Sequence, residues 1–233
     1  VVARRERRLG ALVIDGGPWP DANPESLRQA MRTGMRQLGL DSLPWTHKLR
    51  DWRARVSSLR HWFPEDGWPD LSDTWLAEHL EDWLEPWLDG ITRREHLQRL
   101  DLTAALHGLV DARLRARLSE LAPTHLSVPS GSRIRLQYRP GEPPVLAVKL
   151  QELFGLADTP RVAKGRIPVT LHLLSPAQRP IQVTQDLRGF WERTYAEVKK
   201  ELKGRYPKHP WPDNPWTATP TRRTQAARRP DNN

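Results

Sequence analysis

The spacing of the apolar residues changes near residue 123, and this change constrains the fold more than any other feature of the sequence. Before it, apolar side chains recur every three or four residues, which is typical of helices with one buried face. After it, they recur every second residue in short runs, which is typical of strands. We therefore expect an α+β protein, with a helical bundle over residues 23–122 and an α+β subdomain over residues 123–212.

Helix starts are well marked in the first half. Asn23 followed by Pro24, Thr46 and Ser72 each combine a capping side chain with a following apolar period, and Thr92 begins a capping box. These positions predict helices of about 23–38, 46–63 and 72–85 and a short one from 92. A long helix over 102–121 should follow, ended by Pro123.

The second half predicts a small, mostly antiparallel sheet covered by one helix. Extended runs are expected at residues 125–129, 133–138, 143–148, 166–174 and 181–184, with a short helical stretch at 149–154. An amphipathic helix should then run from Asp186, its N-cap, to about Lys203, with Gly204 as a left-handed C-terminal residue. Residues 205–212 contain three prolines and should lie extended on a surface.

Both ends of the chain differ from the middle. Residues 3–14 predict one strand that finishes in a turn at Asp15–Pro18, or else a frayed arm. Residues 213–233 contain several arginines and few apolar anchors, which predicts a flexible basic tail. Because the first residue is Val1 and not Met, we interpret the chain as a piece of a longer protein.

The net charge of +9 favours a polyanionic partner, since clustered Lys and Arg displace counterions from phosphates. Residues 69–92 are the exception, because they contain seven carboxylates and no Lys or Arg. We expect this acidic helical face to be solvated or docked on a basic neighbour. Its residues Glu78, Glu81 and Glu85 support a competing hypothesis, an independent protein-interaction module without a nucleic-acid role.

No motif for catalysis is found. The chain lacks a phosphate-binding glycine loop, an Asp-Glu-Ala-His run, a nucleophile elbow and a zinc-protease helix, and it has no cysteine. Its histidines are scattered without metal-ligand spacing, so no catalytic, cofactor or metal site is expected. Ser130-Gly131-Ser132 fits either a hairpin turn or an anion-binding nest.

The nucleic-acid hypothesis begins with Arg133 and Arg135, which alternate with apolar residues and should share one face of a strand. Further cations and an aromatic residue could extend that face, so the candidate set is Arg133, Arg135, Arg166, Arg179, Lys199, Lys200, Lys203, Arg205, Lys208 and Trp211. The alternative is that the charges only keep the protein soluble and that the aromatic residues pack on their own domain.

Eight tryptophans lie between Trp19 and Trp87 and could form a base-stacking platform. Most of them recur at core spacing, which favours buried anchors instead. Trp19 and Trp68, each followed by proline, are expected to pack loops.

Four stretches carry a family resemblance: VPSGSRIRLQY at 128–138, LAVKLQELFG at 146–155, LLSPAQRPIQVTQDLRGFW at 173–191 and KGRYPKHPWP at 203–212. Together they resemble the C-terminal region of the bacterial DEAH-box helicase family HrpB, over nearly the whole chain and most strongly from 122 to 220. The resemblance implies that residues 1–18 are the last strand of an OB-like domain.

It further implies a parent ATP-dependent helicase that uses Mg-ATP and acts on nucleic acid, with RNA favoured over DNA. This chain would be an accessory region of that parent, contacting nucleic acid, the helicase core of the same polypeptide, or both. No window is long and apolar enough for a membrane span, so we expect a protein of the bacterial cytoplasm without membrane contact. We also expect it to be a monomer.

Overall fold

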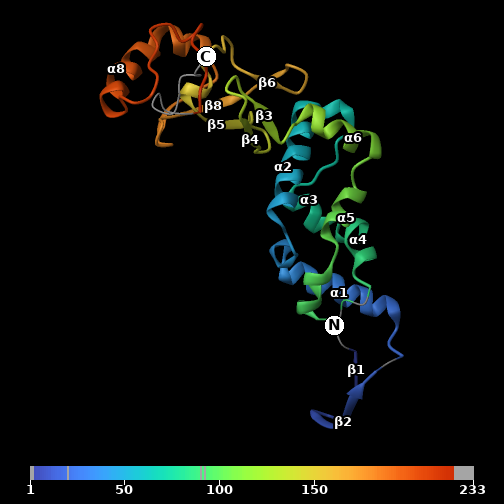
Figure 1. Cartoon of the computed structure of the whole chain (residues 1–233). Helices are drawn as coiled ribbons and strands as arrows, with labels where there is room; N and C mark the ends of the chain where they lie inside the picture. The colour runs from blue at the N-terminus through green and yellow to red at the C-terminus, as the bar shows by residue number, and fades with distance from the viewer. Residues whose placement is uncertain (1–2, 20, 90, 92, 223–233) are drawn as a thin grey trace, which may run out of the picture.

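The molecule is elongated and has three parts in chain order. The structure, a computed structural model, describes residues 3–19, 21–89, 91 and 93–222. A two-stranded hairpin projects from one end, a helical subdomain forms the middle, and a sheet subdomain lies at the other end (Figure 1). This confirms the mixed helix and sheet fold class, with the helices first and the main sheet after them.

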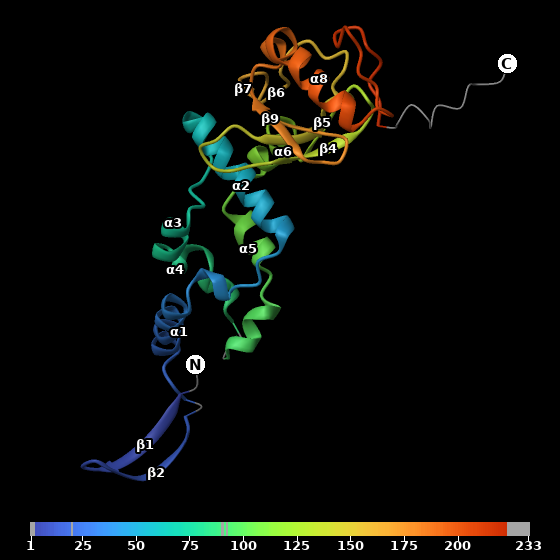
Figure 2. The same ribbon diagram turned by 90° about the vertical axis from the view of Figure 1, so that its left-hand side faces the viewer.

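The N-terminal residues form a hairpin, so the expectation of a single strand was wrong. Strand β1 (Arg4–Leu9) pairs antiparallel with β2 (Leu12–Pro18), and the stretch predicted as a terminal turn lies inside β2. The chain reverses at Gly10, whose φ of 59° suits a residue without a side chain. Figure 2 shows the hairpin extending away from α1. Whether it belongs to an OB-like domain stays a prediction.

Helices α1 (Pro24–Leu38) and α2 (His47–Trp62) begin where the caps predict. The Asn23 side chain accepts a hydrogen bond from the Glu25 amide, and the Thr46 hydroxyl accepts one from the Leu49 amide. Both bonds satisfy donors that a first helical turn leaves free. Local sequence therefore sets these two boundaries.

Two of the longer predicted helices are each divided. The stretch from Ser72 forms α3 (Asp73–Glu78) and α4 (Leu80–Trp83), and residues 102–121 form α5 (Leu102–Gly108) and α6 (Ala112–Leu121). The second break occurs because Asp111 adopts a cap conformation and accepts from the Arg113 amide, which starts a new helix. Thr92 lies outside the described residues, and Arg94–Arg99 forms 3-10 turns, not an α-helix.

The main sheet has five strands in the order β3-β4-β5-β8-β9. These are β3 (His125–Ser127), β4 (Arg133–Gln137), β5 (Val145–Lys149), β8 (Thr170–Leu174) and β9 (Pro180–Thr184). The central pair, β5 and β8, is parallel and the other pairs are antiparallel. A small separate hairpin pairs β6 (Arg161–Val162), which was not predicted, with β7 (Ile167–Pro168), whose residues were expected to continue into β8.

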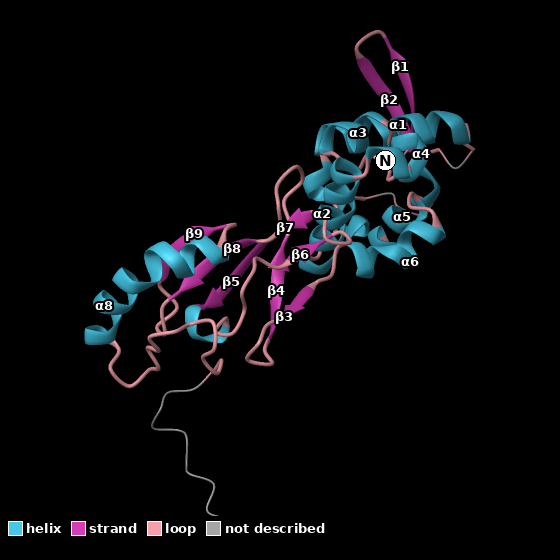
Figure 3. Cartoon of the chain, turned by 90° about the horizontal axis from the view of Figure 1, so that it is seen from above, coloured by secondary structure: helices cyan, strands magenta, loops and turns pink. Residues whose placement is uncertain are grey.

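One face of this sheet is covered by the C-terminal helical segment (Figures 2 and 3). It consists of α7 (Leu187–Gly189), a π-helical turn at Phe190–Thr194 and α8 (Tyr195–Arg205). Asp186 caps it as predicted, accepting from the Gly189 amide. Gly204 does not end the helix: it lies inside α8 and is not among the glycines with positive φ.

A continuous core joins the two subdomains. It includes the buried Trp68, Trp83 and Trp191, and Trp45, Trp52, Trp62 and Trp75 pack against it, which confirms the anchoring role expected for most tryptophans. At the junction, buried Arg55 of α2 donates to the carbonyl of Ala122 at 2.6 Å, and the Tyr138 hydroxyl donates to that of Pro123 at 2.6 Å.

The predicted flexible tail is folded in its first part. The Gly155 amide donates to the carbonyl of Pro215 at 2.9 Å, and the Thr221 amide donates to that of Gln151 at 3.0 Å. Pro215 is buried and Trp216 packs against the core. Residues 213–222 thus cross back onto the sheet subdomain, and residues 223–233 lie outside the described part.

Candidate nucleic-acid interface

Arg133 and Arg135 share one face of β4, as the alternation predicts. Both are exposed, while Leu136 beside them is buried in the core. Across the neighbouring strand, Arg133 lies opposite Ser127 and Arg135 opposite His125. Arg135 also reaches α2, where it forms an ion pair with Asp51 and a 3.0 Å contact with the ring of His47. Arg133 is therefore the freer of the two guanidinium groups.

The α8 lysines lie on another part of the surface. Lys199, Lys200 and Lys203 line a cavity of about 650 Å³ together with Asp213 and Trp216. Lys199 is hydrogen-bonded to Asp213, and this contact holds the pKa of the Asp213 carboxyl below its usual range. One of the three candidate cations is therefore already neutralised by the segment that folds back.

The remaining candidates are dispersed. Arg179 and Arg205 line a small cavity of about 130 Å³ that also contains Glu201. The guanidinium of Arg166 lies over the ring of Phe63, 4.9 Å from its centroid, where α2 meets the sheet subdomain. Lys208 is exposed, and the indole N–H of half-buried Trp211 donates to the carbonyl of Tyr206 at 2.9 Å. The ten predicted residues thus do not form one surface.

The Ser130–Ser132 turn binds a carboxylate of the protein itself. Both serine hydroxyls donate to Oε2 of Glu152, at 2.8 and 2.5 Å, and Glu152 is only 8% exposed. Gly131, with φ of 80°, provides the left-handed residue that the tight turn needs. The turn therefore has a structural function, because the donors that an anion would use are already bonded.

The acidic face is largely paired inside the molecule. Glu85 forms ion pairs with Arg28 at 3.7 Å and Arg32 at 3.2 Å, and Glu81 with Arg36 at 3.5 Å. All three arginines belong to α1, so the acidic stretch docks on a basic neighbour, one of the two expected alternatives. Glu78 remains exposed.

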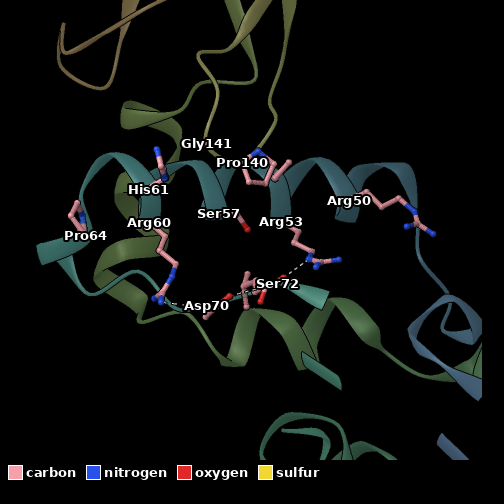
Figure 4. A pocket seen from close by; sticks show the side chains of 12 residues that line it. Arg50, Arg53, Ser57, Arg60, His61, Pro64, Asp70, Ser72, Pro140 and Gly141 are labelled. Atoms are coloured by element: carbon pink, nitrogen blue, oxygen red, sulfur yellow. Dashed lines mark hydrogen bonds and ion pairs between the residues drawn. The ribbon is translucent and has the colours of Figure 1, made fainter. Parts of the chain in front are cut away.

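A groove along α2 was not predicted from the sequence. It has a volume of about 710 Å³ and runs beside Arg50, Arg53, Ser57, Arg60 and His61, as Figure 4 shows. Its other walls are formed by residues 70–72 and by the turn at Pro140 and Gly141. The spacing of its arginines at helical intervals was the available signal, but their partners come from segments that are distant in sequence.

Two arginines of the groove hold the loop that forms its wall. Arg53 donates to the carbonyl of Leu71 at 2.5 Å and pairs with Asp73 at 2.7 Å. Arg60 donates to the carbonyl of Trp68 at 3.0 Å and lies 3.5 Å from Asp70. The hydrogen bond from the Ser72 amide makes the largest contribution to lowering the pKa of the Asp70 carboxyl, and Arg60 and Arg53 contribute less. Arg50 and Arg53 also lie over the ring of Trp45, at 5.3 and 5.2 Å.

The histidines do not form a metal site within the described chain. No group of three or more His, Cys, Asp or Glu residues there could hold an ion. Partial burial lowers the pKa of His209, with a contribution from the ammonium of Lys149, and its ring contacts the Gln151 side-chain oxygen at 2.9 Å. Across the same described residues, no helix is both long and apolar enough to cross a bilayer.

Comparison with known proteins gives a consistent result. Residues 83–215 match the family described as ATP-dependent helicase C-terminal, HrpB_C. The chain is 45% identical over 223 residues to the ATP-dependent RNA helicase HrpB of Escherichia coli K12, covering 96% of this chain and 28% of that protein.

Two crystal structures of the E. coli protein have the same fold over this region. One, titled as a DExH-box NTPase, matches with a TM-score of 0.78 at 45% identity over 95% of this chain and 27% of the other. The second, titled as a DEAH/RHA helicase, gives a TM-score of 0.66 at 43% identity over 89% and 26%. The chain belongs to the HrpB-type ATP-dependent helicase C-terminal family and spans little more than a quarter of the relative that it matches.

Proposed function

We propose that this chain is a non-catalytic accessory region of an HrpB-type ATP-dependent helicase and that it contacts RNA. ATP binding and hydrolysis, with Mg-ATP as the cofactor, would belong to parts of the parent protein outside this chain. The region would act in the bacterial cytoplasm, without a membrane, as one copy in each helicase polypeptide.

The single observation that carries the proposal is the exposed pair of arginines on β4. They lie on the side of the sheet opposite the buried leucine face, in a chain of net charge +9. Phosphate contacts by such residues supply most of the affinity of nucleic-acid binding. RNA is favoured because the E. coli relative is named an RNA helicase.

A second contact, with the helicase core, is supported by the projecting hairpin. Leu9, Leu12 and Ile14 are 70%, 72% and 63% exposed, an unusual concentration of apolar side chains on a short hairpin. A two-stranded hairpin is marginally stable in water unless it packs on something else. The hairpin would gain that packing from the core of the parent helicase.

The competing hypothesis of an independent protein-interaction module has less support. It relied on Glu78, Glu81 and Glu85, and two of these are paired with α1. Another protein could bind those carboxylates only after displacing the arginines that are already bonded to them.

Two measurements test the proposal. A labelled single-stranded RNA is titrated with the purified chain at several salt concentrations, and the separately purified helicase core is titrated with the chain in the absence of RNA. We expect RNA binding that weakens steeply with salt, and core binding that L12E/I14E weakens. Absence of both interactions would refute the accessory role.

A further inference from the structure

We propose that the exposed face of the five-stranded sheet is a platform for single-stranded RNA. We call it the open face and define it by His125, Arg133, Arg135, Lys149, His172 and Val183. This inference rests on the proposed function and goes further, since it selects one surface and adds Lys149, His125, His172 and Val183 to the two arginines.

The strand register places these residues on one side of the sheet. Arg135 lies opposite His125, Ala147 lies beside His172, and His172 lies opposite Val183. Directly paired residues point to the same face, and alternate residues of one strand do so too. Arg133 and Lys149 therefore join the set, because they are two residues from Arg135 and Ala147 on their own strands.

The opposite side of the sheet is the covered one. Leu136, Leu146, Val148, Leu171 and Leu173 occupy the alternate positions and are at most 2% exposed. Leu187, Phe190 and Trp191 belong to the same core cluster, and Figure 2 shows α8 lying over the sheet. Val183 on the open face is 57% exposed, although its type favours burial.

The charge of the open face suits a polyanion. It carries two guanidinium groups, one ammonium and two imidazoles, and none of the residues in the five strands is Asp or Glu. One acid from outside the sheet, Asp51 of α2, pairs with Arg135. Lys149 also lies close enough to His209 to lower its pKa, so the segment at 206–212 borders this end of the face.

A single strand fits this surface better than a duplex does. An exposed sheet lets unpaired bases lie against flat side chains while basic groups contact the phosphates. His125, His172 and the arginine planes can stack on bases, and Val183 with Ala147 supplies an apolar floor. In duplex RNA the bases are already stacked on one another and unavailable to the sheet.

The test compares two matched pairs of charge removals on opposite sides of the sheet subdomain. R133Q/K149Q removes two charges from the open face, and K200Q/K203Q removes two exposed charges from α8. The probe is a fluorescent 12-nucleotide oligouridylate at 0.1 M salt, with a 12-base-pair RNA duplex as the second arm. Thermal unfolding of each variant verifies that it is folded.

Each phosphate contact to a single strand contributes about 0.7 decade of affinity at 0.1 M salt, so two lost contacts should weaken binding about 25-fold. We expect this loss in R133Q/K149Q and less than a twofold change in K200Q/K203Q, with weaker binding of the duplex. Equal losses, or a larger loss in K200Q/K203Q, would overturn the open face and leave the proposed function standing. Failure of the wild-type chain to bind RNA would instead remove the RNA role itself.

A second pair adds a carboxylate instead of removing cations. V183E places one on the edge strand β9 of the open face, opposite His172, and A196E places one on exposed α8. We expect V183E to weaken oligouridylate binding by more than tenfold and A196E to leave it within twofold. Unchanged binding by folded V183E would contradict the proposal even if R133Q/K149Q bound weakly.

Discussion

The α2 groove and the open face of the sheet are both rich in arginine, yet their donors are used differently. In the groove, Arg53 and Arg60 bind backbone carbonyls and carboxylates of the loop that faces them. On the open face, Arg133 has no carboxylate partner within the described chain, and the strands around it contain no acid. The arginines of the groove therefore hold the protein together, while Arg133 on the sheet remains available to a ligand.

The largest effect on stability should come from the buried arginine of α2. In R55M, the carbonyls of Ala122 and Leu118 lose their guanidinium donor at the junction of the subdomains. Leaving such buried groups unpaired costs about 1–3 kcal/mol, so the free energy of unfolding measured by urea denaturation should fall by that amount. Oligouridylate affinity of the folded variant should be unchanged.

R50Q is the control for that change, since Arg50 is exposed on the same helix. It should alter the free energy of unfolding very little. An R55M protein of normal stability, or one that is folded but binds RNA weakly, would contradict the purely structural role proposed for α2.

The next largest difference between the α2 groove and the open face should be in the salt dependence of RNA binding. R133Q/K149Q should reduce the slope of log affinity against log salt by about 1.4, which is the value for two phosphate contacts to a single strand. R50Q should leave the slope unchanged. A slope that decreases in R50Q would show that the groove also contacts the backbone of the RNA.

A smaller effect is expected inside the groove itself. R53A removes the hydrogen bond to Leu71 and the ion pair to Asp73, and we expect a loss of about 0.5–1.5 kcal/mol in the free energy of unfolding. Amide hydrogen exchange of residues 71–73 should accelerate in R53A. Unchanged exchange there would mean that the loop is held by its other contacts.

The smallest effect is a change in the titration of His209. Its pKa is lowered in the folded protein, so the unfolded chain binds the proton more readily. The resulting contribution to stability is complete above the unfolded value of about 6.5 and decreases as the pH falls below it. K149Q should raise the pKa of His209 measured by NMR, and R133Q should not. An unchanged pKa of His209 in K149Q would show that the 206–212 segment does not border the open face.

Features set by neighbouring residues were predictable from the sequence. The caps at Asn23, Thr46 and Asp186 depend on amides within three positions, and the alternation of Arg133 and Arg135 depends on one strand. Features that join distant segments were missed. Lys149 reaches the open face through the pairing of β5 with its neighbours, and the groove needs α2, the 70–72 loop and the Pro140 turn to meet.

The divided helices and the hairpin have a different cause. Periodicity alone could not show that Asp111 would start a new helix, since the apolar spacing continues through it. In the hairpin, one residue with positive φ, Gly10, reverses a chain whose composition also suits a single strand. In both places one residue's backbone conformation decides the structure.

The bonds from Thr221 to Gln151 and from Gly155 to Pro215 also affect how the protein is made. They join the turn after β5 to almost the last described residues of the chain. During translation, β3, β4 and β5 leave the ribosome well before their closing segment exists, and pairing of distant segments is slow to form. The sheet subdomain should therefore complete its native structure only after residues 215–221 have been synthesised, later than the helices that precede it.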